Sequence, residues 1–150
     1  FFAYKGYDKK DRIVSLIEAI CSLAIVVFPC NPHQPGVTNV GLFNLNAGFS
    51  QLLHSAFSAV LFIAYAFNVT FLFTLGKGEP TKRKKIRNII YYALGVIIWI
   101  GIILQAVYVV DFLKIKEGFP FTMINEIIML TAFGTAYLIK SEAVAKLNDE

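Results

Sequence analysis

Five polar side chains that can hydrogen-bond or exchange a proton interrupt stretches of the chain that are otherwise apolar. They are His54, Ser58, Gln105, Asn125 and Glu126. In a low-dielectric layer, a pair formed by His54 and Glu126 would shift the pKa of both groups, as catalytic or proton-handling pairs do. Such a cluster could bind a lipid or cofactor, relay protons or line a transport path. The alternative is a set of structural hydrogen bonds between helices, and both interpretations stay open.

Cys30 and His33 form a second candidate, a Cys-x-x-His pair in a proline-rich segment. With His54 and Glu126 they could ligate zinc or copper, which bind thiolate, imidazole and carboxylate groups. A pair of this kind more often anchors a loop, so we expect no metal and no cofactor. The chain has no glycine-rich phosphate loop, nucleophile elbow or His-Glu-x-x-His run. We therefore assign no catalytic residue and favour a protein that is not an enzyme.

The elements that carry these residues are long apolar blocks. The 150 residues are 57% hydrophobic and only 16% charged, whereas a soluble domain has about a quarter charged residues. A helix needs roughly 20 residues to cross about 30 Å of hydrocarbon. The sequence predicts a single all-α transmembrane bundle over residues 1–150, with spans at about 13–28, 52–75, 89–110 and 121–139. Phe1 to Tyr4 read as the last turn of a further helix that precedes the numbered chain.

The charged segments between the blocks predict the topology. Six of the fourteen Lys and Arg residues fall in 77–87, so we expect this loop, and with it the C-terminus, on the cytoplasmic side of a cell membrane. Segment 29–50 has no charged residue and is expected outside, as a re-entrant or surface-hugging loop. The basic residues at 77–87 are not spread over a folded face, which excludes nucleic acid as the partner. They could instead contact anionic lipid headgroups. The five basic residues chosen as the candidate contact are Lys82, Arg83, Lys84, Lys85 and Arg87.

This topology places the polar residues at defined depths. At about 1.5 Å per residue, His54, Gln105, Asn125 and Glu126 fall in one outer layer. Helical spacing puts Gln51, His54, Ser55 and Ser58 on one face of their helix, which we expect to look toward Glu126. In the opposite leaflet, Glu18 either reaches Arg12 or Lys10 near the headgroups or pairs with Asn68.

Several short runs resemble sequences from small bacterial multi-pass membrane proteins. These runs are Phe28-Pro29-Cys30 at the end of one span, His54 with Ala56, Ala59 and Phe62 in the next, Tyr4 to Asp8, and Lys85 to Tyr91. That group includes families of unknown function and is distantly similar to the DRAM/Frag/Sfk-type membrane proteins. The resemblance implies five or six spans and singles out His54, but it implies no reaction.

Two functions of different class follow. The first is a non-catalytic accessory or scaffold subunit that binds membrane lipids and the helices of other membrane subunits. The second is an outer-leaflet polar cavity, lined by His54, Gln105 and Glu126, for a lipid, a cofactor or protons. We favour the first, because the polar positions are isolated and no cofactor motif exists.

Overall fold

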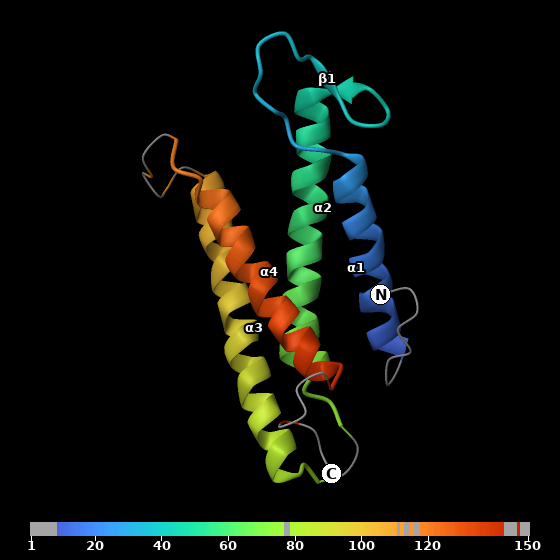
Figure 1. Cartoon of the computed structure of the whole chain (residues 1–150), viewed down its shortest axis with the longest axis vertical. Helices are drawn as coiled ribbons and strands as arrows, with labels where there is room; N and C mark the ends of the chain where they lie inside the picture. The colour runs from blue at the N-terminus through green and yellow to red at the C-terminus, as the bar shows by residue number, and fades with distance from the viewer. Residues whose placement is uncertain are drawn as a thin grey trace. The chain divides into compact units, whose positions relative to one another are not determined.

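The computed structural model describes residues 9–76, 79–110, 112, 115, 118–142 and 147. Its helices are α1 (Lys9–Val27), α2 (Ala47–Phe67), a π-helical turn η1 (Asn68–Leu72), α3 (Lys82–Val109) and α4 (Phe121–Lys140). The chain forms two compact units, an N-terminal unit, Phe1–Ala64, and a C-terminal unit, Tyr65–Glu150. Over the residues described, the fold is all-α, as predicted, apart from one very short hairpin (Figure 1). Some of the expectations concern residues that lie outside those described. These residues are Phe1 to Tyr4, Lys77 and most of 111–117 and 143–150.

Among the described residues, three helices are long and apolar enough to cross a membrane. They are Ala47–Leu72 with 26 residues, Lys82–Val109 with 28, and Phe121–Lys140 with 20. At about 1.5 Å per residue each reaches the roughly 30 Å of a hydrocarbon core. This is the composition of a multi-pass membrane protein. The predicted spans at 52–75, 89–110 and 121–139 correspond to these three helices.

Two helices begin before the predicted spans, and in both cases a helix cap explains the earlier start. The span predicted from 52 begins at Ala47, because the Asn46 side-chain oxygen accepts hydrogen bonds from the backbone N–H groups of Gly48 and Phe49. The predicted basic loop is largely helical, because the Thr81 hydroxyl accepts from the Lys84 N–H at 3.0 Å and starts α3 at Lys82. Caps of this kind satisfy N–H groups that have no partner within the helix.

Helix α1 covers the fourth predicted span, but its composition differs from that of the other three. Five charged residues, at positions 9–12 and 18, lie within its 19 residues. The buried and exposed sides of α1 are the reverse of those of a helix in water. The buried side carries Asp11, Ser15 and Glu18 with two small residues, whereas Arg12 is on the exposed side. The exposed apolar face is made by Ile13, Leu16, Ile17, Ile20, Leu23 and Val26.

The N-terminal unit contains a hairpin between α1 and α2 that the sequence analysis did not predict. Strands β1 (Asn39–Val40) and β2 (Leu45–Asn46) pair antiparallel, with Asn39 opposite Asn46 and Val40 opposite Leu45. Gly41 and Asn44 adopt positive φ angles of 75° and 50° at the ends of the four-residue turn. Both residue types tolerate this conformation. The hairpin leads directly into α2 (Figure 1).

In the C-terminal unit, α3 packs along α4 and against η1 (Figure 1). Small residues permit the close approach, as is common between helices in membranes. A Cβ atom built on Gly95 would lie 2.3 Å from Thr70 Oγ1, and one on Gly101 would lie 2.5 Å from Met129 Cγ. The Phe73 ring, just after η1, meets Tyr91 edge-on at 5.6 Å between ring centroids and lies 6.3 Å from Tyr137.

Candidate functional site

The first polar grouping joins the end of α1 to the first turns of α2. The Ser50 hydroxyl donates to the Pro29 carbonyl at 2.8 Å. The Gln51 side-chain oxygen accepts from the Asn31 N–H at 2.9 Å. His54 Nδ1 lies 2.8 Å from the Phe28 carbonyl oxygen. These side chains bond to backbone groups of the residues that directly follow α1.

The His54 contact fixes the form of the imidazole ring. A carbonyl oxygen can only accept a hydrogen bond, so Nδ1 must carry the proton. In the neutral ring, Nε2 is then an acceptor. The structure therefore gives His54 a structural partner within the N-terminal unit, at the joint between the two helices.

The predicted polar face of the second span is only partly as expected. Ser58 is buried, and Gln51 and His54 are half-buried, but Ser55 is exposed and accepts a hydrogen bond from Gln51 Nε2 at 3.1 Å. Ser50, which was not among the predicted residues of this face, is buried instead. The positions of Ser50, His54 and Ser58, each four residues apart, would have indicated this face if the helix start at Ala47 had been recognised.

The second grouping lies between α3 and α4 in the C-terminal unit. Asn125 Nδ2 donates to the Gly101 carbonyl at 2.9 Å and to Gln105 Oε1 at 3.2 Å. Gln105 Nε2 donates in turn to the Thr122 hydroxyl at 3.0 Å. Asn125 thus uses both of its N–H donors. Gln105 and Asn125, which the depth argument placed in one layer, lie together here and join the two helices.

We expect this network to stabilise the pairing of α3 with α4. In a double-mutant cycle of Gln105→Ala and Asn125→Ala, the coupling free energy should be about 0.6 kcal/mol and at most about 2 kcal/mol, the range measured for hydrogen bonds between membrane helices. The measurement is reversible unfolding in mixed lipid–detergent micelles. Thr122→Ala, which removes only the bond to Gln105, is the control and should couple to Gln105→Ala but not to Asn125→Ala. Strict additivity of Gln105→Ala and Asn125→Ala would contradict the network.

Glu126 follows Asn125 on α4 and is half-buried. Successive helical residues point about 100° apart, so Glu126 does not share the direction of Asn125. His54 belongs to the N-terminal unit and Glu126 to the C-terminal unit. Their pairing therefore stays a prediction. Glu18, for which two partners were considered, is 0% exposed near the middle of α1.

The Cys-x-x-His pair lies on the segment between α1 and β1. Cys30 and His33 are both exposed, and His33 donates its backbone N–H to the Asn31 side chain at 2.9 Å. Within the part of the chain that the structure describes, no group of three His, Cys, Asp or Glu side chains gathers closely enough to hold a metal ion. The local hydrogen bond from the His33 N–H to the Asn31 side chain stabilises the backbone of this segment.

The five basic residues of the candidate lipid contact lie at the beginning of α3, and Lys140 lies at the end of α4. Cations are unfavourable near the positive N-terminal end of a helix dipole, yet Lys82, Arg83, Lys84, Lys85 and Arg87 all lie in the first two turns of α3. Lys84 Nζ donates to the Leu75 carbonyl at 2.9 Å and to the Phe73 carbonyl at 3.3 Å. Lys140 Nζ also donates to the Phe73 carbonyl at 3.3 Å and lies 5.6 Å from the centroid of the Phe73 ring. These lysines therefore cap carbonyls just beyond η1.

Comparison with known proteins finds no family model, no curated protein and no solved structure that matches the chain.

Proposed function

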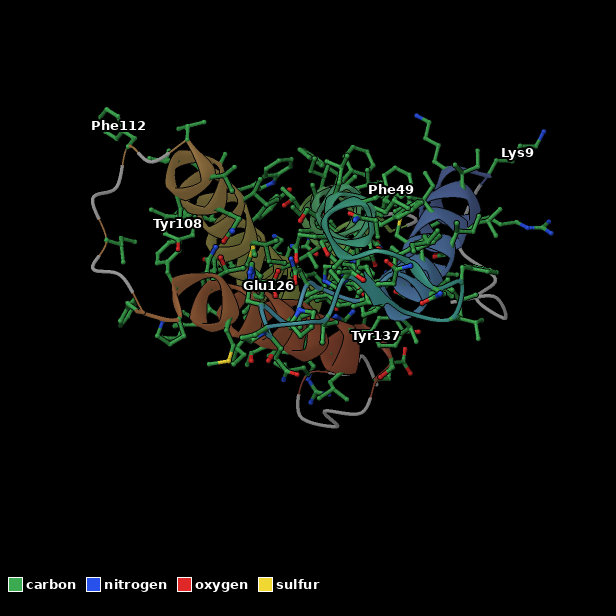
Figure 2. All side chains as sticks on the ribbon, turned by 90° about the horizontal axis from the view of Figure 1, so that it is seen from above. Lys9, Phe49, Tyr108, Phe112, Glu126 and Tyr137 are labelled. Carbon is green, nitrogen blue, oxygen red and sulfur yellow. The ribbon has the colours of Figure 1, made fainter. Side chains whose placement is uncertain are left out.

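We propose that this chain is a non-catalytic membrane protein with four spans, which acts as an accessory or scaffold subunit. Its outer helix faces would bind lipid and the helices of partner proteins. The observation that carries the proposal is the apolar outer face of α3, combined with polar side chains that form hydrogen bonds inside each unit. Figure 2, viewed from above, shows that the side chains projecting outward from α3 and α4 are mostly carbon.

The reversed amphipathic pattern of α1 supports a fourth span. In water, burying Asp11, Ser15 and Glu18 while exposing one face of large apolar residues would be unfavourable on both sides of the helix. A bilayer suits the same arrangement better, because acyl chains solvate the apolar face and the acidic side chains face the protein interior, as ionisable groups within spans almost always do. Lys9 and Lys10, at the start of α1, are placed to extend toward the headgroups.

The polar groups support a structural role rather than a chemical one. His54 bonds to the end of α1, and Gln105 and Asn125 bond to each other and to the backbone of α3. Hydrogen bonds of this kind are the usual use of Asn, Gln and His between membrane helices. A binding or transport site would be expected to direct these donors and acceptors at a ligand.

The exposed face of α3 is suited to bind a partner helix. Its exposed apolar residues recur at alternating spacings of three and four, as in helix pairs that cross at a shallow angle. They are Ile86, Ile89, Ala93, Val96, Ile100 and Ile103. The basic start of α3 favours the cytoplasmic leaflet, by the usual bias of Lys and Arg. There it would also contact anionic headgroups, at about 1 kcal/mol for each basic residue near the surface.

A photo-crosslinking amino acid at Ile100 tests the partner-binding role in native membranes. Irradiation should yield one discrete protein adduct, which mass spectrometry would identify. Leu130 on α4, which is also exposed and apolar, is the matched position outside the α3 face and should not give the same adduct. Adducts only with lipid at Ile100 would overturn the partner-binding part of the proposal.

A further inference from the structure

The turn of the hairpin presents large apolar side chains where turns normally present polar ones. In the turn Gly41–Asn44, Leu42 is 80% exposed and Phe43 is 61% exposed. Turns that face water are dominated by Gly, Pro, Asn, Asp and Ser. Gly41 and Asn44 supply the backbone conformations of this turn, so Leu42 and Phe43 are not needed for its geometry. Exposing two adjacent large apolar side chains to water is unfavourable, so we expect an apolar environment around them.

The turn is held at the level where α1 ends. A Cβ atom on Gly41 would lie 2.8 Å from Pro29 Cδ and 3.0 Å from the Val27 carbonyl oxygen, so the turn backbone lies close to the last residue of α1 and to Pro29 just beyond it. The Phe43 ring lies 6.2 Å from the Phe28 ring, centroid to centroid. The turn therefore folds back onto the helix end instead of extending away from it. If α1 is a span, this level is the boundary between acyl chains and headgroups.

The composition and hydrogen bonding of the segment permit burial in that boundary. No Asp, Glu, Lys or Arg occurs between Glu18 and Lys77, so no charge has to leave water. Several backbone groups beside the turn are satisfied internally, which lowers their cost of leaving water. The Asn44 carbonyl accepts from Asn39 Nδ2 at 2.8 Å, the Asn44 N–H donates to the Gly41 carbonyl, and the Ala47 N–H donates to the Thr38 carbonyl.

We propose that the turn Gly41–Asn44 inserts Leu42 and Phe43 into the lipid interface of the leaflet that surrounds the end of α1. The occupant of this apolar surface is the headgroup–acyl boundary of the bilayer, as for other interfacial anchors. The inserted turn would hold the hairpin against the membrane and fix the tilt of α1 and α2 at this end. The inference rests on the proposed placement of α1 and α2 in the membrane.

Depth-dependent fluorescence quenching tests the insertion in the full chain. Trp99 is the single tryptophan, so Trp99→Phe gives a silent background into which Phe43→Trp is introduced. In phosphatidylcholine vesicles, its emission should shift to the blue. Lipids brominated near the headgroup end of the acyl chain should quench it more strongly than lipids brominated near the chain terminus. Gln34→Trp, an exposed position in the same segment, is the control and should be quenched by neither.

A third variant separates failure of this inference from failure of the proposed function. Leu23→Trp lies on the exposed apolar face of α1 and should be quenched if α1 is a span. Quenching at Leu23→Trp without quenching at Phe43→Trp would overturn the insertion of the turn and leave the four-span proposal standing. This would also be the result if a partner protein covered the turn. Absence of quenching at Leu23→Trp would overturn the four-span proposal itself.

Discussion

Replacing Ile20 with aspartate should prevent α1 from crossing the membrane. Ile20 lies near the middle of α1 on its exposed apolar face, so under the proposal of four spans the new carboxylate would face acyl chains. An acidic residue at the centre of a span costs about 2.5–3.5 kcal/mol of insertion free energy. If α1 lay in water, the same substitution would change stability by no more than about 0.5 kcal/mol. The two environments therefore predict clearly different results for one substitution.

Cys30 provides the measurement, because it is exposed just beyond α1 whereas Cys21 is buried. In a Cys21→Ser background, a membrane-impermeant maleimide added to the non-cytoplasmic side should label Cys30. With Ile20→Asp this labelling should fall sharply, whereas Gln34→Asp, in the exposed segment beyond Cys30, should leave it unchanged. Equal labelling of the Ile20→Asp variant and the parent would show that α1 is not a span.

Gly95→Leu should be the most damaging substitution in the C-terminal unit. Even a single methyl group at Gly95 would lie 2.3 Å from Thr70 Oγ1, 3.3 Å from its Cβ and 3.4 Å from its Cα. A leucine can be accommodated only if α3 moves away from η1, and overpacking of this kind costs about 1–3 kcal/mol or more. We expect a loss of about 3 kcal/mol in the free energy of unfolding, measured in mixed lipid–detergent micelles.

Gly134→Leu is the matched control, since no atom lies within 4 Å of a Cβ built on Gly134. This change should be neutral or stabilising by up to about 1 kcal/mol, because glycine is a poor helix former. Thr70→Ala should partly rescue Gly95→Ala by removing the nearest atom. Equal destabilisation by Gly95→Leu and Gly134→Leu would mean that α3 does not approach η1 this closely.

Long apolar runs made the three spans predictable, because a chain segment of that length and composition has few other structures available. Boundaries were harder. The starts of α2 and α3 depend on single caps, Asn46 and Thr81, and both helices begin with residues that hydropathy alone assigns to loops. The hairpin escaped prediction because its strands have only two residues each, too few for an alternating pattern. Asn39, Gly41 and Asn44 are residues typical of turns, and they were the features of the sequence that could have indicated the hairpin.

The proximity of Gln105 and Asn125 was predictable from their depth, whereas the directions of the polar side chains were not. Counting residues placed Gln105 and Asn125 in one layer, and the structure joins them directly. The same count placed Glu126 in this layer as well, although its side chain leaves α4 in a different direction from that of Asn125. The double capping of the Phe73 carbonyl by Lys84 and Lys140 could not be anticipated. It depends on where the preceding helix ends, and that end is set by a π-helical turn with no clear sequence signature.

The π-helical turn also determines how many residues the chain needs between α2 and Phe73. A π turn contains roughly one residue more than an α turn, and each helical residue rotates the chain by about 100°. The π turn at Asn68–Leu72 fits this additional residue into a single turn, so Phe73 keeps the direction that brings it to Tyr91 and Tyr137. Deleting one residue there would restore an ordinary turn and leave Phe73 in nearly the same direction, whereas winding the same residues as an α-helix would swing Phe73 away by about 100°.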